Sequence, residues 1–306
     1  MNTPAFYNPE KVGTFFTPRT ALVADVERDA TVTPSTEDEQ RTLLLLIDTQ
    51  IDFIHADGAL SVPGAIEDTR RVIDWIFKQG EKITTIAASL DSHVPIQIFS
   101  PSWWVDANGN HPAPYTIITQ QALDDGEWKP LYSEEWSFSY VEKLEEQFKK
   151  QLMIWPYHTL IGTVGHNLEP SLYEAVVYHS LVRQTEPIFL MKGLIPRTEH
   201  YSILEPEVKI PNEPMGDINM QFLKMLTSYD RVYLAGQAKS HCVLETLMSI
   251  MRYLGDDPEM IAKFHLLMDC TSSVYHPEID FDALANETLN QLAKRGLKLL
   301  TTQDAV

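Results

Sequence analysis

A cysteine that could act as a nucleophile lies where a predicted strand turns into a predicted helix. Cys242 closes the run Val232-Tyr-Leu-Ala-Gly236-Gln-Ala-Lys-Ser-His-Cys242, in which a glycine follows an apolar segment. At the first turn of a helix, the helix dipole and free backbone N–H groups favour a thiolate and can hold an oxyanion. Cys242 is therefore a candidate nucleophile, although a buried structural cysteine is the commoner fate of a free thiol. The other cysteine, Cys270, lies in the apolar run 264–270, so the chain has no disulfide framework and no Cys-x-x-Cys pattern.

Asp48 and Lys192 end two further predicted strands and could act together with the thiol. Asp48 would accept the thiol proton and return it to a leaving amine. Lys192 would lower the pKa of the thiol and hold the carboxylate through an ion pair. Taken singly, an aspartate at a strand end is more often a cap, and a lysine there more often faces solvent. The three residues therefore predict acyl-transfer chemistry only if the fold brings their strand ends together.

A second group of side chains has the chemistry of metal ligands. Asp91 and His93 lie two residues apart, so both side chains can face one way in an extended segment. His158 could complete a three-ligand site that leaves positions for water and substrate. An Asp-x-His pair is a weak signal by itself because it often occurs by chance. His241 is expected to point away from Cys242, because successive helix positions do not share a face. Surface positions are expected for His55, His111, His166 and His276.

The elements that must position these residues alternate between apolar strands and amphipathic helices. This alternation predicts an α/β fold with a doubly wound, mostly parallel sheet flanked by helices. Ligands of such sheets bind outside the carboxyl ends of the strands, where Asp48, Asp91, Lys192 and the turn before Cys242 are expected. Strands are predicted at 41–47, 82–90, 188–192, 231–235, 265–269 and 297–301, and helices at 67–78, 220–227, 240–253 and 279–295.

Two segments lie outside this alternation. Residues 1–40 show little periodicity and contain four prolines, and we interpret them as an N-terminal extension rather than a core element. The segment of about 100–151 is rich in Trp, Pro and Asn and ends in a predicted charged helix at 140–151. We interpret it as an insertion over the sheet edge, within one domain of residues 41–306. It would be a lid, an oligomer contact, or a surface excursion without a catalytic role.

The composition argues against several classes of function. With 24 basic and 43 acidic residues the formal charge is −19, whereas nucleic-acid binding needs a basic surface. The longest purely apolar run, Leu43–Ile47, is too short to span a membrane. No signal-peptide pattern opens the sequence, and no Gly-x-Gly-x-x-Gly motif follows a strand. We therefore expect a cytoplasmic protein that binds neither nucleic acid nor membranes and uses no nucleotide cofactor.

Six short motifs, in a definite order, span roughly residues 42–302 outside the extension and the insertion. They are Leu46-Ile-Asp48-Thr-Gln-Ile-Asp52-Phe53, Ser89-Leu-Asp91-Ser-His93, Trp155-Pro-Tyr-His158 with Gly162-Thr-Val-Gly165, Met191-Lys192-Gly193, Glu199-His-Tyr201-Ser, and Gly236-Gln-Ala-Lys-Ser-His-Cys242-Val. In kind and order they resemble the nicotinamidase branch of the isochorismatase-like cysteine hydrolases. The resemblance implies that fold and a cysteine hydrolase domain at 41–306.

The resemblance also implies a catalytic unit. Asp48, Lys192 and Cys242 would form a catalytic triad. A cis peptide bond would lie at Gln237–Ala238, and the N–H groups of Ala238 and Cys242 would form an oxyanion hole. The implied reaction is hydrolysis of a small-molecule amide, such as nicotinamide, to the acid and ammonia through a cysteine thioester.

The remaining motif residues would hold the metal and the substrate ring. The implied metal is a divalent ion, zinc in the first place, with iron or manganese as alternatives. A homo-oligomer is also expected, since oligomers are common in this fold. The implied metal ligands are Asp91, His93 and His158, and the implied aromatic pocket consists of Phe53, Trp155 and Tyr201.

Three departures from the family pattern leave the substrate open. Gln97 stands in the run where many members have another histidine, which leaves three protein ligands for the metal. Lys239 replaces the usual Thr or Ser and brings a positive charge toward the nucleophile, and Thr159 replaces a more typical Cys. One alternative is a cysteine hydrolase of another amide or carbamoyl compound with a vestigial metal site. The other is a non-catalytic member that binds a ligand or partner through the insertion.

Overall fold

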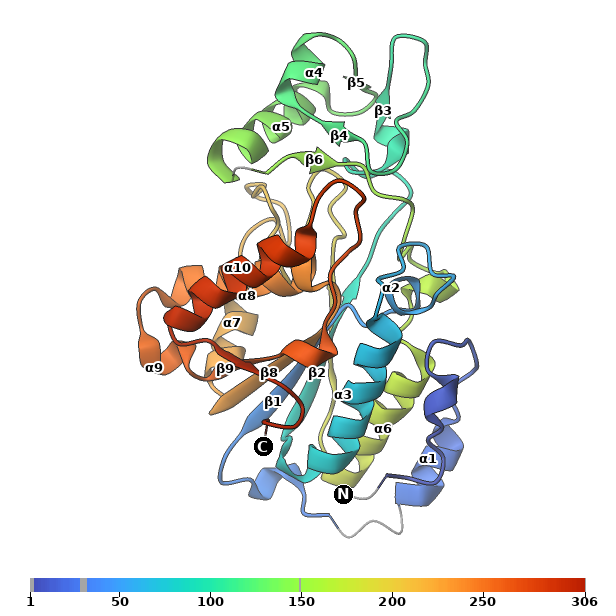
Figure 1. Cartoon of the computed structure of the whole chain (residues 1–306), viewed down its shortest axis with the longest axis vertical. Helices are drawn as coiled ribbons and strands as arrows, with labels where there is room; N and C mark the ends of the chain where they lie inside the picture. The colour runs from blue at the N-terminus through green and yellow to red at the C-terminus, as the bar shows by residue number, and fades with distance from the viewer. Residues whose placement is uncertain (1–2, 28–31, 149, 306) are drawn as a thin grey trace.

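A six-stranded parallel sheet crosses the centre of the protein (Figure 1). The computed structural model describes residues 3–27, 32–148 and 150–305. From the central strand β1 the chain winds first to one edge of the sheet and later to the other, which confirms the predicted doubly wound α/β fold. The direction in which successive strands are added to the sheet reverses between β1 and β8. Sheets of this kind bind ligands at that place. Across the sheet the order is β10 (Lys298–Leu300), β9 (Phe264–Leu267), β8 (Arg231–Gly236), β1 (Thr42–Ile47), β2 (Thr85–Asp91) and β7 (Ile188–Lys192).

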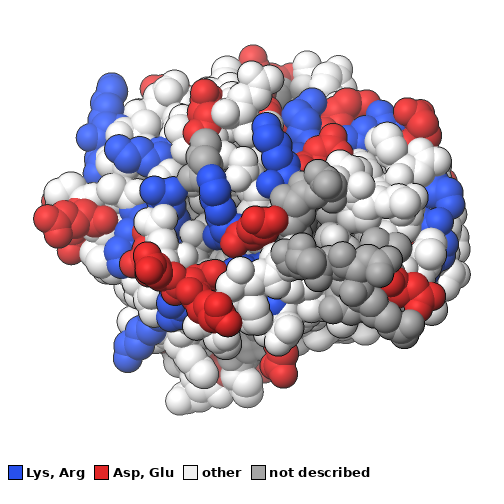
Figure 2. All heavy atoms as spheres, turned by 90° about the horizontal axis from the view of Figure 1, so that it is seen from below, with Lys and Arg blue, Asp and Glu red and all other residues white. Residues whose placement is uncertain are grey.

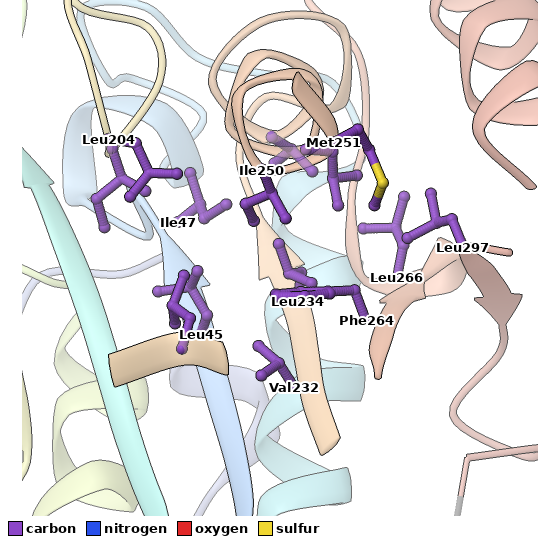
Figure 3. Packing of buried hydrophobic residues seen from close by; sticks show 14 of the residues in the cluster. Leu45, Ile47, Leu204, Val232, Leu234, Ile250, Met251, Phe264, Leu266 and Leu297 are labelled. Carbon is purple, nitrogen blue, oxygen red and sulfur yellow. The ribbon is translucent and has the colours of Figure 1, made fainter. Parts of the chain in front are cut away.

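Strand β1 is buried along its whole length because helices cover both faces of the sheet. Leu44 and Leu46 pack into one hydrophobic cluster, and Leu43, Leu45 and Ile47 pack into another on the opposite face. Figure 3 shows this second cluster, in which side chains of β1, β8 and β9 meet those of a covering helix. A continuous apolar run is the sequence pattern of such a strand, as predicted.

The helices form two layers, one on each side of the sheet (Figure 1). One layer contains α1 (Thr20–Glu27), α3 (Ala65–Gln79) and α6 (Pro170–Arg183), and the other contains α7 (Met220–Thr227), α8 (Leu244–Leu254), α9 (Pro258–Ile261) and α10 (Phe281–Lys294). Single turns connect them: α2 (Ile51–Ile54) and the 3-10 turns η1 (Pro9–Lys11), η2 (Ser35–Glu37), η3 (Gly80–Lys82), η5 (Val164–His166) and η7 (Met268–Cys270).

The predicted elements are present, with shifts at their ends, and one long helix was missed. The strand at 188–192 and the helix at 220–227 coincide with β7 and α7. The strand predicted at 82–90 begins only at Thr85, because residues 80–82 form a 3-10 turn. Helix α6 has no predicted counterpart. It is buried on most of its surface, so its sequence lacks the polar stripe that reveals a surface helix.

The N-terminal segment packs against the core, contrary to the prediction for residues 1–40. Phe6, Val12 and Val23 belong to the same hydrophobic cluster as α3 and α6. Arg19 donates to Glu174 on α6, with 3.1 Å between Nη2 and Oε2. Isolated apolar residues among prolines carry no period, which is why the sequence pattern did not reveal this packing.

The inserted segment forms a separate layer above the carboxyl ends of the strands (Figure 1). Two small antiparallel pairs and two helices build it, and its large side chains form a hydrophobic cluster of their own, which reaches down to Phe53, Trp155 and Ala238. The charged helix predicted at 140–151 is longer at its start, and residue 149 lies outside the described residues. The elements are η4 (Pro101–Trp103), β3 (Trp104–Val105), β4 (Ile117–Ile118), α4 (Gln120–Asp124), β5 (Lys129–Pro130), α5 (Glu134–Phe148) and β6 (Leu152–Met153).

The surface seen from below carries both signs of charge. Figure 2 shows Lys and Arg interspersed with Asp and Glu over this face. The acidic excess of the sequence is therefore not gathered there into a patch of one sign. Within the described ranges, no helix combines the length and the apolar character needed to cross a bilayer.

Glu169 supplies a testable link between the fold and pH. Its buried carboxylate caps α6 by accepting from Leu172 N at 2.8 Å and also accepts from Gly13 N at 3.4 Å. Burial raises the pKa of Glu169 to about 7 from the ordinary 4.5. The folded protein thus keeps this proton to higher pH than the unfolded chain. Its contribution to stability is complete below pH 4.5 and is lost as the pH rises toward 7.

We expect Glu169→Gln to remove this pH dependence. Between these two pH values, the wild-type free energy of unfolding should fall by about 3 kcal/mol relative to that of the variant. Urea unfolding at a series of pH values measures the difference. Glu67→Gln, at an exposed glutamate of α3, is the control and should leave the wild-type profile unchanged. Parallel profiles for wild type and Glu169→Gln would contradict the assignment.

Candidate active site

A buried ammonium group joins the strand ends that the sequence singled out. Lys192, at the end of β7, is 1% exposed. Its Nζ lies 2.9 Å from Asp48 Oδ2, 2.9 Å from Asp91 Oδ1 and 3.5 Å from Cys242 Sγ. It also donates to the carbonyl oxygen of His200 at 3.0 Å. Burial alone would lower the pKa of Lys192, but Asp48, Asp91 and Cys242 outweigh it and raise the pKa well above its usual value. The group therefore stays charged.

Asp48 is held rigidly at the end of β1. Its backbone is in the left-handed region, with φ of 47°. Its N–H donates to Ser89 Oγ at 2.9 Å, and that hydroxyl donates back to Oδ1 at 2.5 Å. Burial raises the pKa of the Asp48 carboxyl, while Lys192 opposes the rise. A carboxylate with a raised pKa beside a thiol is suited to accept and return a proton.

Cys242 lies in a π-helical turn, η6 (Lys239–Val243), that leads into α8. The turn follows Gly236, whose φ is 120° and where an added Cβ would lie 2.1 Å from the carbonyl oxygen of Ile47. Only glycine therefore allows β8 to approach β1 this closely. The peptide bond Gln237–Ala238 is cis, as the resemblance implied.

Burial has a larger effect than Lys192 on the pKa of the thiol. Burial raises the pKa of Cys242 well above its usual value. Lys192 lowers this pKa, as expected, but does not compensate for burial, and a hydrogen bond to Asp48 also favours the thiol. The Asp48 carboxylate beside this thiol is the group that could accept its proton.

The three predicted metal ligands converge on one point. The ligand atoms of Asp91, His93 and His158 all lie within 4.8 Å of one another, and all three residues are buried. Oδ2 of Asp91 is 2.8 Å from His93 Nε2 and 3.6 Å from His158 Nε2. The pKa of Asp91 is lowered well below its usual value, because His93 and Lys192 together outweigh the opposite effect of burial. The cluster therefore offers one carboxylate and two imidazoles to a cation.

The surroundings of this cluster fit a metal ion. His158 Nδ1 lies 2.7 Å from the carbonyl oxygen of Pro156. A carbonyl only accepts, so Nδ1 carries a proton, and Nε2, on the side of Asp91, is the ring nitrogen that would bind a cation. The Gln50 side chain holds the Asp91 backbone with two hydrogen bonds. Its Oε1 accepts from the Asp91 N–H at 2.7 Å, and its Nε2 donates to the Asp91 carbonyl at 2.8 Å. At Gly193, with φ of 81°, an added Cβ would lie 2.8 Å from the His93 ring.

A cavity of about 30 Å³ opens between the thiol and this cluster. The predicted aromatic residues Phe53, Trp155 and Tyr201 line it together with Asp91, His158 and Cys242. Trp155 Nε1 donates to the Tyr201 hydroxyl at 2.9 Å. The volume holds only about one or two waters. An aromatic ring therefore enters only if lining side chains move outward.

Two histidine predictions are wrong. His241 lines the same cavity as Cys242 and contacts Trp155 and Tyr201, with ring centroids 5.3 and 5.4 Å apart. The spacing argument assumed an α-helix, whereas this backbone is a π-helical turn against which the cavity lies. His55 is 2% exposed at the end of α2 and not a surface group.

Sequence reasoning assigned no role to several residues that the fold brings to the site. Glu199 lines the cavity, and burial, followed by the charge of Asp91, raises its pKa to about 8. His200 is buried, with its carbonyl on Lys192. Ser89 and Gln50 orient Asp48 and Asp91. The signal available for Glu199 and His200 was their presence beside Tyr201 in one motif.

Two of the three departures from the family pattern have local explanations. Gln97 is buried, accepts from Val94 N at 3.1 Å and donates to the Gly193 carbonyl at 2.7 Å. Lys239 pairs with Asp282 at 2.8 Å, so its charge is neutralised at the surface of α10 instead of acting on the thiol. The backbone N–H of Thr159 donates to Asp52 Oδ2 at 2.7 Å, a bond that does not depend on the side chain, and nothing in the structure explains the threonine itself.

Comparison with known proteins shows the fold. No protein-family model matches the sequence, and no curated protein matches it. Solved structures with a similar fold are nicotinamidases. The yeast nicotinamidase Pnc1p bound to the inhibitor nicotinaldehyde is 18% identical with a TM-score of 0.57, covering 85% of this chain and 99% of that one. An Acinetobacter baumanii nicotinamidase pyrazinamidase is 15% identical with a TM-score of 0.56, covering 88% and 100%. L. infantum PnC1 in complex with nicotinate is 19% identical with a TM-score of 0.52, covering 90% and 98%.

Metal binding can be measured without any assay of activity. We expect metal-depleted protein to bind about one equivalent of zinc, because a carboxylate and two imidazoles form an open zinc site. His158→Ala should weaken binding at least about 100-fold, since even changes behind the ligands cost about 10- to 100-fold. Titration calorimetry measures both. His111→Ala, at an exposed histidine, should bind like wild type. Equal affinity in the His158 variant would rule out this site.

Proposed function

We propose that the chain is a cysteine amidohydrolase of the nicotinamidase type, which hydrolyses a small aromatic carboxamide such as nicotinamide to the acid and ammonia. The observation that carries this proposal is the position of Lys192. Its ammonium group lies within 3.5 Å of the thiol and within 2.9 Å of both carboxylates. Nucleophile, proton acceptor and metal cluster thus share one buried centre beside an aromatic cavity. The similarity of the fold to nicotinamidases supports the same class of reaction.

In the first half of the proposed reaction, Cys242 forms a thioester. As the sulfur attacks the carboxamide carbon, the thiol proton passes to Asp48. The backbone N–H groups of Ala238 and Cys242 hold the oxyanion. The neighbouring backbone N–H groups of Lys239 and His241 already donate to the carbonyls of Ser272 and Ala238, so they are not free to hold the oxyanion. The carbon–nitrogen bond then breaks, and the proton on Asp48 moves to the departing nitrogen, which leaves as ammonia.

In the second half, water cleaves the thioester. Asp48 takes a proton from the attacking water, the carbon–sulfur bond breaks, and the proton returns to the sulfur of Cys242 as the acid leaves. Lys192 remains charged throughout and stabilises the negative charge that appears in turn on the sulfur and on Asp48. The net change is one amide and one water converted to one acid and one ammonia.

Substrate positioning belongs to the remaining residues of the site. Phe53, Trp155 and Tyr201 would pack against the aromatic ring. When bound at Asp91, His93 and His158, a divalent cation would offer a coordination position to the nitrogen of a pyridine ring. The protonated carboxyl of Glu199 lines the same cavity and can donate a hydrogen bond there.

Ammonia release from nicotinamide tests the proposed function. We expect Cys242→Ala to lower the rate at least about 10³-fold, because removal of a nucleophile abolishes the covalent route. Chelator treatment should also lower the rate, and zinc should restore it. Cys270→Ala removes the other buried cysteine and should retain the wild-type rate. Undiminished release by the Cys242 variant would show that the thiol is not the nucleophile.

A further inference from the structure

Five rings form a closed circuit beside the candidate active site. Tyr115 contacts Trp155 and His276, with ring centroids 6.0 and 6.3 Å apart. His276 contacts Phe281 at 5.8 Å, Phe281 contacts His241 at 4.9 Å, and His241 contacts Trp155 at 5.3 Å. The circuit joins the insertion, the turn that carries Cys242 and the segment before α10. Segments distant in sequence therefore build one aromatic border.

Residues of this circuit line two hollows, an inner one and an outer one. Trp155 and His241 line the cavity of about 30 Å³ that contains the thiol. On the other side, His276 and Phe281 line an outer hollow of about 570 Å³. Val274 lines both. The inner cavity admits a ring only if its lining side chains move outward, whereas the outer hollow has room for a substituent.

Tyr115 is the contribution of the insertion to this border. Its backbone is in the left-handed region, with φ of 70°, and its N–H donates to the Ile154 carbonyl at 2.6 Å, next to Trp155. The side chain is 40% exposed, and it reaches the two hollows through its contacts with Trp155, which lines the inner one, and His276, which lines the outer one. Tyr115 is therefore placed to influence the choice of substrate without touching the reacting atoms.

The outer hollow favours an uncharged substituent over an anionic one. Its basic side chain Lys239 is paired with Asp282. Glu278 and Asp280 also line the hollow and would repel an anion. The rings of His276 and Phe281 offer edges and faces to another aromatic ring.

We propose that Tyr115 and His276 form a subsite for a neutral aromatic substituent, and that the preferred substrates are nicotinamide-type carboxamides substituted at ring position 5. This inference rests on the proposed function. With the ring nitrogen toward the metal cluster and the carboxamide toward Cys242, position 5 is the ring position directed away from both. The substituent would pass Trp155 and lie between Tyr115 and the outer hollow.

Hydrolysis of nicotinamide and of 5-phenylnicotinamide by the zinc-loaded full-length chain tests the subsite. We expect wild type to show the higher kcat/KM with 5-phenylnicotinamide. Tyr115→Ala should lower kcat/KM about tenfold for this substrate, through KM, and less than about twofold for nicotinamide. Tyr115→Phe should behave like wild type. Tyr132→Ala is the matched control, since Tyr132 lies in the same insertion and is 39% exposed, and packs against Trp103 instead.

Binding to Cys242→Ala separates failure of the subsite from failure of the proposed function. Calorimetry should show tighter binding of 5-phenylnicotinamide than of nicotinamide, and loss of this preference when Tyr115→Ala is added. If the chain hydrolyses nicotinamide but Tyr115→Ala leaves the preference between the two amides unchanged, the subsite is wrong and the proposed function stands. If neither amide binds or reacts, both the proposed function and the subsite are wrong. If binding follows the expected pattern without hydrolysis, the subsite stands and the proposed reaction fails.

Discussion

The structure of the site depends on the burial of one ammonium group. An unpaired charge costs several kcal/mol when it is removed from water, so Lys192 requires partners wherever the fold places it. The sheet supplies them through its register. Asp91 lies opposite Lys192 in the pairing of β2 with β7, and Asp48 follows the last residue of β1, the next strand. The close approach of β8 to β1 at Gly236 then brings the turn of Cys242 to the same ammonium group.

Asp91 connects the two chemical parts of the site. One of its oxygens pairs with Lys192, and the other faces His93 and His158. Charge at the metal cluster therefore acts on Lys192 through a single carboxylate, and Lys192 in turn acts on the thiol. Gln50 fixes the backbone of Asp91 with two hydrogen bonds, so the carboxylate that connects the metal cluster to Lys192 is held in place.

The insertion packs behind the wall of the candidate site, whereas the sequence left its role open among several interpretations. Its hydrophobic cluster is continuous with Phe53 and Trp155. At its end, Lys150 forms ion pairs of 2.6 Å with Glu207, which follows the Glu199–Tyr201 segment, and with Glu245 on α8. These contacts tie the inserted layer to both segments that line the cavity. The shape of the cavity is therefore set partly by residues outside the six motifs.

The sequence by itself determined the layered α/β fold and the position of each motif, because buried strands and glycine turns are encoded in local patterns. It placed Asp48, Asp91, Lys192 and Cys242 at strand ends or at the turn that follows a strand, and the structure brings these residues together. It did not reveal the buried helix α6, the packing of Phe6 and Val23, or the place of His241 in the cavity. The sequence also could not show that the pKa of Cys242 rises, because the effect of burial on the thiol outweighs that of Lys192. These features depend on which surfaces meet and how much water they exclude, and only the tertiary structure decides that.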